Sequence, residues 1–164
     1  MEKDKIITRV TEPSDWVNSI VVVEKPKTGQ LRIRLDPKAL SDSICKPYYP
    51  MPTLEYVTAD LKGAPHFSIL DITHAYWSIE FEKESSMLTT FSTPFGRWRY
   101  LRLPFDISSS GDIFQRKVHE IFQNIFGIHA IVDDILISGR SKAEHDENLR
   151  NTLQRAREAG IRLS

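Results

Sequence analysis

The stretch that most constrains the fold of this chain is residues 128–139, in which two adjacent aspartates stand between two short β-branched runs. Apolar runs of this length, closed by Ser138 and Gly139, are typical of β-strands. An Asp-Asp pair between two strands is typical of a turn. The stretch therefore predicts a β-hairpin that holds Asp133 and Asp134 at a fixed place on a rigid sheet.

A third aspartate occurs in a matching setting. Residues 67–71 form another apolar run, and this run ends on Asp71. Carboxylates held close together repel one another, and a cation between them keeps them ionised. Hard oxygen ligands suit Mg²⁺ or Mn²⁺. Three strand-borne carboxylates, split one plus two, suit a two-metal site for phosphoryl transfer.

Two other interpretations of the aspartate pair compete with a metal site. The pair can simply be a turn between two core strands. Receiver domains of response regulators also carry an Asp pair beside an apolar strand, but there the pair closes the first strand, whereas here it lies late in the chain. The third carboxylate favours the metal site over both.

Length and charge set broad limits. The 164 residues suffice for one compact domain or two small subdomains that share a core. The 22 basic and 22 acidic residues give zero net charge, which argues against a general nucleic-acid-coating protein but permits a local basic face. No apolar run approaches the ~20 residues of a membrane span, so no membrane partner is expected. A single cysteine, Cys45, excludes an internal disulfide framework and favours an intracellular setting.

The first half of the chain predicts a hairpin of two strands, Ser19–Glu24 and Leu31–Asp36, joined by a basic, glycine-containing loop. Alternation in the second strand places Leu31, Ile33 and Leu35 on one face. Residues 36–45 are expected to be irregular. A helix over residues 54–62, capped by Thr53, and extended segments at 67–71, 78–82, 88–92 and 97–102 are expected to follow.

The second half predicts helix, hairpin and helix. Apolar residues recur with helical spacing over residues 110–124. Ser141 and Glu144 match a capping box that opens a helix ending at Gly160, with an apolar stripe at His145, Leu149, Leu153 and Ala156. Helices on one face of a small antiparallel sheet give an α+β fold with the aspartates on the free face.

The sequence resembles reverse transcriptases, and most closely the polymerase domain of gypsy-like LTR retrotransposons. The similarity runs from Val10 to Ser164 in the order of the family. The blocks that carry it are residues 16–25 (WVNSIVVVEK), 31–37 (LRIRLDP), 49–53 (YPMPT), 67–71 (FSILD), 88–96 (LTTFSTPFG), 101–105 (LRLPF), 114–116 (FQR), 132–137 (VDDILI) and 144–146 (EHD).

The resemblance implies a right-hand polymerase fold of the α+β class, with fingers and palm but no thumb. Fingers are expected at about residues 1–45 and 79–109. The palm, an antiparallel sheet with helices on one face, is expected at about residues 46–78 and 110–164, truncated at its C-terminal side. The implied activity is RNA-directed DNA polymerisation with two Mg²⁺ ions, or Mn²⁺. The implied partners are an RNA or DNA template with its primer, deoxynucleoside triphosphates, and the rest of a Pol polyprotein with thumb, RNase H and integrase.

The resemblance also assigns roles to single residues. Asp71, Asp133 and Asp134 correspond to the catalytic, metal-binding carboxylates. The residues expected to contact the nucleotide are Lys25, Arg32, Ile72, Tyr76 and Phe105. Those expected near template or primer are Gln115, Ile131 and Val132. Tyr76 is expected to pack under the sugar and reject a 2′-hydroxyl, a role compatible with packing in the sheet.

Two departures from the family pattern support a second hypothesis, in which the chain has no polymerase activity. Ile131 stands where the family has tyrosine, and Asp106 stands where it has glycine. A carboxylate at position 106 is expected to face the triphosphate and repel it. The alternative function is therefore a degenerate or truncated retroelement remnant without polymerase activity, acting at most as a binding module.

Overall fold

The computed structural model describes residues 1–24, 26, 29 and 31–164, without the side chains of Arg32 and Leu54. The chain divides into two compact units. Unit 1 comprises residues 1–46 and 76–110, and unit 2 comprises residues 47–75 and 111–164. No helix among the described residues combines the length and the apolar character that crossing a membrane requires.

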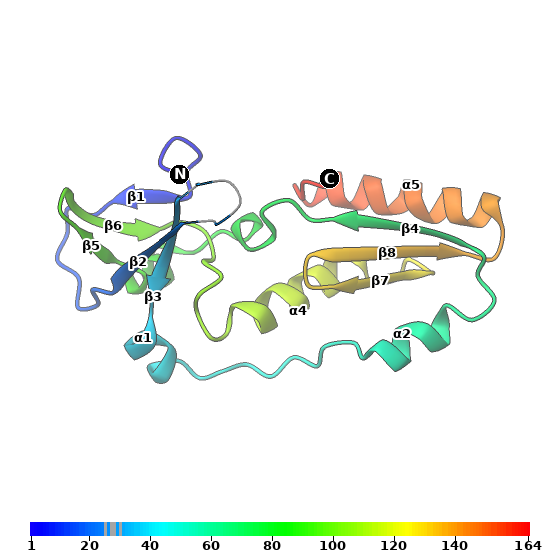
Figure 1. Cartoon of the computed structure of the whole chain (residues 1–164), viewed down its shortest axis with the longest axis horizontal. Coiled ribbons are helices and arrows are strands. Elements are labelled where there is room, and N and C mark those ends of the chain that lie inside the picture. Colours follow the sequence, from blue (N-terminus) through cyan, green and yellow to red (C-terminus); the bar gives the residue numbers. More distant parts are fainter. Residues whose placement is uncertain (25, 27–28, 30) are drawn as a thin grey trace. The chain divides into compact units, whose positions relative to one another are not determined.

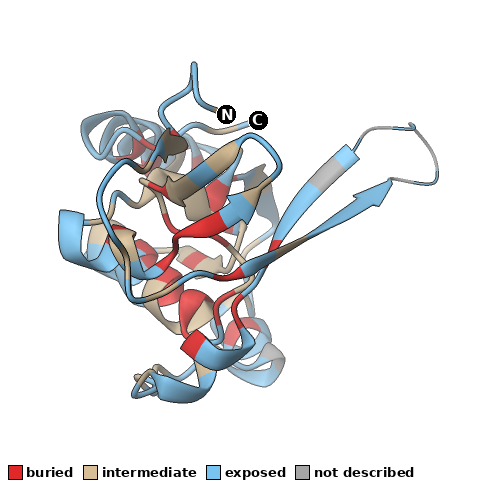
Figure 2. Ribbon diagram, turned by 90° about the vertical axis from the view of Figure 1, so that its left-hand side faces the viewer, coloured by how far each residue is buried: buried red, intermediate tan, exposed pale blue. Residues whose placement is uncertain are grey.

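Unit 1 contains two antiparallel sheets. The first has the strand order β1 (Ile7–Arg9), β6 (Gly96–Tyr100), β5 (Phe91–Thr93). The second is the expected hairpin of β2 (Ser19–Glu24) and β3 (Leu31–Asp36), in register from Ser19 opposite Asp36 to Glu24 opposite Leu31. Leu35 at the base of this hairpin is 3% exposed, whereas Leu31 is 71% exposed. The apolar face of β3 is therefore buried only at the base, and most of the hairpin is exposed (Figure 2).

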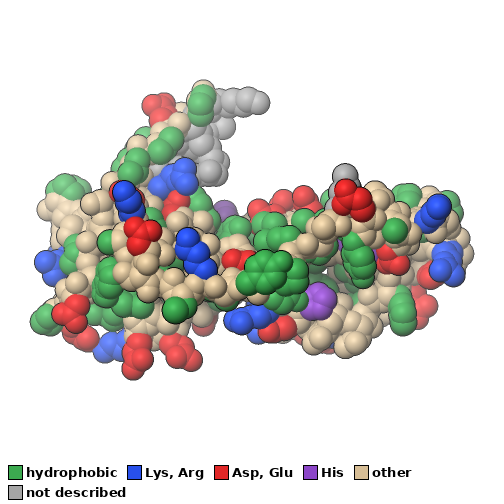
Figure 3. All heavy atoms as spheres, turned by 90° about the horizontal axis from the view of Figure 1, so that it is seen from below, with side chains coloured by type: hydrophobic (Ala, Val, Ile, Leu, Met, Phe, Trp, Pro, Cys, Tyr) green, Lys and Arg blue, Asp and Glu red, His purple; other side chains and the backbone are tan. Residues whose placement is uncertain are grey.

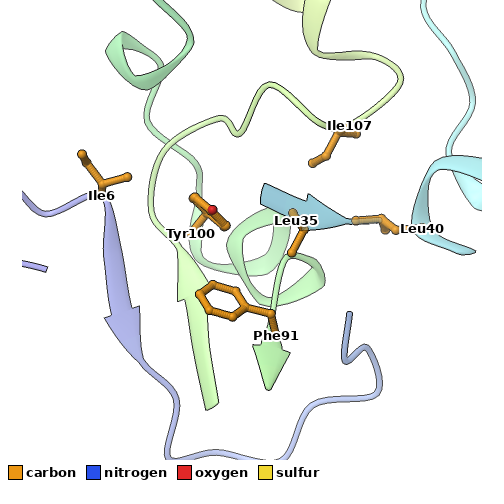
Figure 4. Close-up of a cluster of buried hydrophobic side chains, with 6 residues drawn as sticks. All are labelled: Ile6, Leu35, Leu40, Phe91, Tyr100 and Ile107. Atoms are coloured by element: carbon orange, nitrogen blue, oxygen red, sulfur yellow. The ribbon is translucent and has the colours of Figure 1, made fainter. Parts of the chain in front are cut away.

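The core of unit 1 is a cluster of apolar side chains from segments far apart in the sequence. Figure 4 shows its six buried residues, Ile6, Leu35, Leu40, Phe91, Tyr100 and Ile107. The rings of Phe91 and Tyr100 lie 5.5 Å apart, at a tilt of 46°. The cluster joins β3, β5, β6 and α1 (Lys38–Ser43) and so fixes the base of the hairpin.

Two short helices in unit 1 were not predicted. Residues 36–45, expected to be irregular, contain α1, which has no side-chain cap but buries Leu40. The segment expected to be extended at 78–82 begins on the last residue of the 3₁₀ helix η1 (Ala75–Ser78) and forms an isolated β-bridge from Glu80 to Arg102. The unpredicted helix α3 (Lys83–Leu88) follows it. In α3 the hydroxyl of the fully buried Ser86 donates to the carbonyl of Tyr100. Both helices depend on tertiary contacts, which a local sequence pattern does not report.

Unit 2 is an antiparallel sheet of strand order β4 (His66–Asp71), β8 (Asp134–Gly139), β7 (Ile128–Ile131). Its helices are α2 (Leu54–Asp60), α4 (Ser110–Phe122, whose first residue falls in unit 1) and α5 (Lys142–Glu158). In Figure 1, α5 runs along β4 and β8, which it contacts. Ile135 and Ile137 of β8 are fully buried. Phe67 and Ile69, whose side chains lie on the opposite face of the sheet, are 50% and 69% exposed.

The predicted helix starts of unit 2 are confirmed. The Thr53 hydroxyl accepts a hydrogen bond from the backbone N of Tyr56, and α2 ends two residues earlier than expected. Ser141 caps α5 by accepting from Glu144 N at 3.2 Å. The Glu144 carboxylate accepts from Arg140 N at 2.8 Å, one residue before the position that a capping box predicts.

The predicted apolar stripe of α5 is wrong at its centre. The buried residues are His145, Asn148, Thr152 and Ala156, whereas Leu153 is 44% exposed. Asn148 donates to the carbonyl of Ser138 at 2.9 Å, and Thr152 donates to the carbonyl of Asn148. Asn148 and Thr152 can be buried in place of the expected leucines, because their side chains are hydrogen-bonded.

Candidate active site

The β7–β8 hairpin places the two adjacent aspartates in different settings. Ile131 pairs with Asp134, so the two-residue turn consists of Val132 and Asp133, and Asp134 is the first residue of β8. Val132 has φ 52°, a left-handed conformation that β-branched residues rarely adopt. Such backbone strain persists only where surrounding contacts enforce it, and it is often found at functional sites.

A buried glutamine of α4 supplies these contacts. Gln115 is 1% exposed. Its Oε1 accepts from Val132 N at 2.9 Å, and its Nε2 donates to the Ala130 carbonyl at 2.7 Å. One amide therefore satisfies the backbone on both sides of Ile131 and fixes the turn from outside the sheet. The expected contact of Gln115 with a template strand stays a prediction.

Strand β4 brings the third aspartate to the same end of the sheet. Asp71 lies directly opposite Asp134 in the β4–β8 register. Side chains of directly opposed residues project on one face with Cβ atoms about 5 Å apart. Ile72, 2% exposed, donates its backbone N to the Asp133 carbonyl at 2.7 Å. The structure thus gathers Asp71, Asp133 and Asp134, three positions that the sequence analysis selected.

The electrostatics of this cluster favour a cation. Oδ1 of Asp133 is buried without a hydrogen-bond partner among the described residues. Burial, followed by the Asp71 and Asp134 carboxylates, raises the pKa of the Asp133 carboxyl. A divalent ion would compensate both the unpartnered oxygen and the like charges. The oxygen donors are the type that Mg²⁺ and Mn²⁺ prefer, so these residues fit such an ion.

The side chains are neighbours rather than a preformed cage. Within residues 1–24, 26, 29 and 31–164, no three His, Cys, Asp or Glu side chains are grouped so that they could hold a metal ion as they stand. Binding would therefore require the carboxylates of Asp71, Asp133 and Asp134 to turn toward a common ion.

Ser164 is a partner of the cluster that the sequence analysis missed. Its hydroxyl donates to Asp71 Oδ1 at 3.2 Å. Two backbone hydrogen bonds also join Asp71 and Ser164, and Thr73 N donates to the carbonyl of Arg162. No local signal marks Ser164, because its partner lies 93 residues away in the sequence.

Four of the five predicted nucleotide contacts, all except Ile72, fall in the sequence ranges of unit 1. Lys25 lies outside the described residues, and Arg32 is placed on β3 opposite Val23 without a described side chain. Tyr76 in η1 and Phe105 are half-buried. Ile72 is in unit 2 with the aspartates, as are Ile131 and Val132, both half-buried.

The expectation for Asp106 is wrong about its surroundings. Its carboxylate does not project freely, since the side chain is 5% exposed. Oδ1 accepts from Arg34 Nε at 2.8 Å, and Oδ2 accepts from Leu35 N at 3.0 Å. The negative charge is paired and hydrogen-bonded within unit 1, so a repulsive charge aimed at a triphosphate is not what the structure shows.

Charge on the visible surface is mixed. On the face drawn in Figure 3, described Lys and Arg side chains alternate with Asp and Glu side chains rather than gathering in a patch of one sign. This pattern agrees with the zero net charge of the sequence.

Comparisons with known proteins show which family the chain is similar to. Residues 7–164 match the family described as "Reverse transcriptase (RNA-dependent DNA polymerase)". The chain is 32% identical over 151 residues to the uncharacterized protein K02A2.6 of Caenorhabditis elegans, covering 91% of this chain and 12% of that protein. It is 30% identical over 155 residues to the transposon Tf2-3 polyprotein of Schizosaccharomyces pombe, covering 93% and 12%.

Solved structures give the same result for the fold. The protease-reverse transcriptase of prototype foamy virus aligns with a TM-score of 0.86 at 24% identity, over 99% of this chain and 22% of that one. A foamy viral protease-reverse transcriptase in complex with double-stranded DNA aligns with a TM-score of 0.84 at 25% identity, over 99% and 28%. The chain thus spans roughly an eighth of the curated relatives and about a quarter of these solved chains. A match over nearly its whole length shows that the chain belongs to the reverse transcriptase family.

Proposed function

We propose that this chain is the polymerase core of a retroelement reverse transcriptase, with unit 1 as fingers and unit 2 as palm. The observation that supports this most directly is the pairing of Asp71 with Asp134 beside Asp133. Relatives include the Tf2-3 polyprotein and the Pol polyprotein of transposon 297 of Drosophila melanogaster. The proposed partners are accordingly the remaining parts of such a polyprotein, a primed RNA or DNA template and deoxynucleoside triphosphates.

The proposed reaction is addition of a deoxynucleotide to a primer 3′ end. Asp71, Asp133 and Asp134 would hold two Mg²⁺ ions, which in such a site lower the pKa of the attacking hydroxyl and neutralise charge on the triphosphate. The β4–β8 register and the turn held by Gln115 keep the three carboxylates at one end of the sheet. The protein contributes position and electrostatics rather than a covalent intermediate.

The other residues are proposed to surround the substrates. Arg32 and Lys25 would contact the triphosphate, where an arginine fork suits paired oxygens. Tyr76, Phe105 and Ile72 would line the nucleotide. Ile131 and Val132 of the β7–β8 hairpin, and Gln115, which binds the backbone of this hairpin, would lie near primer and template.

Primer extension tests this function. The chain should extend oligo(dT) on poly(rA) with dTTP only when Mg²⁺ or Mn²⁺ is present. Asp133→Asn should lower the rate by about 100-fold or more, because it removes a ligand of the ions that would neutralise charge in the transition state. Glu147→Gln, which changes an exposed carboxylate of α5 in the same unit, is the matched control and should leave the rate unchanged. Extension that persists in Asp133→Asn, or without a divalent ion, would contradict the proposal.

Sugar discrimination tests the role of Tyr76 separately. Tyr76→Val should raise ribonucleotide incorporation relative to deoxynucleotide by about tenfold or more, because less side chain would remain to exclude a 2′-hydroxyl. Tyr76→Phe keeps the ring and should retain the parent ratio. The measurement is the ratio of kcat/KM for UTP and dTTP. An unchanged ratio in Tyr76→Val would assign the side chain to packing alone.

A further inference from the structure

We propose that Asp106 is a positioning residue for nucleotide binding, because its carboxylate fastens the base of the β2–β3 hairpin to the loop of residues 103–107. The effect on nucleotides rests on the proposed function, since β3 carries Arg32 and the loop carries Phe105. The Asp106 tie, meaning the hydrogen bonds of this carboxylate with Arg34 and Leu35, lies within unit 1 and does not depend on any activity.

The contacts of Asp106 reach both segments at once. Arg34 Nε donates to Oδ1 at 2.8 Å, and Leu35 N donates to Oδ2 at 3.0 Å. The guanidinium carbon of Arg34 lies 5.3 Å from the centre of the Phe105 ring, within the range of a cation–π contact. One carboxylate oxygen of Asp106 therefore binds the Arg34 guanidinium, and the same guanidinium lies over the ring of Phe105.

Oδ2 of Asp106 accepts a backbone hydrogen bond at the edge of β3 that a neighbouring strand would otherwise accept. Strand β3 has a hydrogen-bonded neighbour only on its β2 side, within the described sheets. Leu35 N points away from β2 to Asp106, so the carboxylate satisfies a backbone donor on the free edge of the hairpin. A glycine at position 106 offers no such acceptor.

Surrounding contacts make the tie rigid. Leu35, whose backbone N makes the contact, and Ile107, which follows Asp106, are 3% and 6% exposed and belong to the same apolar cluster. Ser108 N donates to the Ser41 hydroxyl at 3.3 Å, which joins the end of the loop to α1. The Asp106 side chain is 5% exposed and Arg34 is 49% exposed, so water screens this pair only from the arginine side. An isolated buried carboxylate is costly, and its partners on β3 must therefore stay in place.

Steady-state kinetics test the positioning role. In the primer-extension reaction, Asp106→Asn and Arg34→Met should each raise KM for dTTP by about tenfold, because misplaced contact groups weaken binding, while kcat changes less than about threefold. Arg34→Met also covers the case in which Asp106→Asn fails to fold, since Arg34 is half exposed. Glu12→Gln is the matched control, because Glu12 and Lys83 form an ion pair at 3.1 Å over a similar sequence separation but on the exposed surface. A KM that is unchanged or lower in Asp106→Asn and Arg34→Met would overturn the proposal.

A double-mutant cycle in urea unfolding separates the tie from the proposed function. Asp106→Asn and Arg34→Met should show a coupling of about tenfold in the unfolding equilibrium constant, as for a charged hydrogen bond. Glu12→Gln and Lys83→Met should couple by less than about threefold. If the parent chain neither extends a primer nor binds dTTP, the proposed function fails, and the positioning role for nucleotides falls with it. A coupling below threefold for Asp106 and Arg34 would overturn the tie whatever the activity.

Discussion

Among single residues, Asp133 has a carboxyl group whose pKa is shifted by its surroundings. Burial and the carboxylates of Asp71 and Asp134 raise its pKa, so the folded chain binds a proton here more tightly than the unfolded chain does. This contribution to the free energy of unfolding is complete below about pH 4, the ordinary aspartate pKa, and is lost as the pH rises through the raised value.

Stability against pH tests this assignment. Over the interval above pH 4, the free energy of unfolding of Asp133→Asn should exceed that of the parent by an amount that grows with pH. Asp42→Asn, which changes an exposed carboxylate of α1, should follow the parent curve. Addition of Mg²⁺ at pH 7 should raise the Tm of the parent but not that of Asp133→Asn. Parallel curves for the parent and Asp133→Asn would contradict the assigned surroundings.

Gln115 is the second residue whose role follows from its contacts. The Gln115 amide accepts a hydrogen bond from Val132 N and donates one to the Ala130 carbonyl. Gln115→Leu removes both hydrogen bonds. Unfolding in urea should show a loss of roughly 2–4 kcal/mol, the cost of two backbone groups left unsatisfied. Gln123→Leu, an exposed glutamine just after α4, should change stability by less than about 0.5 kcal/mol. An equal loss in both variants would mean that the turn does not depend on Gln115.

Among the elements of unit 2, β8 and the first turn of α5 approach each other closely at Gly139. A Cβ added at Gly139 would lie 2.4 Å from the backbone N of His145, a distance that no packing adjustment of a side chain relieves. Glycine is therefore required here by the separation of strand and helix rather than by its backbone conformation.

Alanine substitutions at two glycines test this contact. Gly139→Ala should destabilise the chain by about 3 kcal/mol or more, because α5 must move away from β8. Gly111→Ala in α4 is the matched control, since its Cβ would meet only Met51 Cε at 3.9 Å. That variant should be stabilised by roughly 0.5–1 kcal/mol, because alanine favours the helix. The measurement is urea unfolding followed by circular dichroism, and a mild effect at Gly139 would contradict the packing.

For the molecule as a whole, tryptophan fluorescence can report on unit 1 separately from unit 2. All three tryptophans, Trp16, Trp77 and Trp98, belong to unit 1. Phe91→Ala in the core of unit 1 should lower the free energy of unfolding reported by tryptophan fluorescence by roughly 3–5 kcal/mol, through lost burial and a cavity. Phe95→Ala, an 81% exposed phenylalanine in the turn before β6, is the control and should have little effect. Similar losses in the two variants would show that the cluster of Figure 4 does not stabilise unit 1.

Features that depend on short-range signals were predictable from the sequence alone. The hairpin at Asp133, the caps at Thr53 and Ser141 and the β2–β3 hairpin all follow from turn residues, capping side chains and periodicity within a few positions. A second apolar run that ends on an aspartate pointed to Asp71 as the third carboxylate, and the register opposite Asp134 agrees with that choice.

Features whose partners are distant in the sequence became apparent only in the folded chain. The hydrogen bond from Ser86 of α3 to the Tyr100 carbonyl spans 14 residues. The hydrogen bond from Ser164 to Asp71 spans 93 residues, and the ion pair of Asp106 with Arg34 spans 72. A local pattern cannot report such contacts, because the free energy of a buried polar group depends on which partner packing brings to it. For this reason Asp106 looked like a repulsive charge in the sequence and is an anchored, paired carboxylate in the fold.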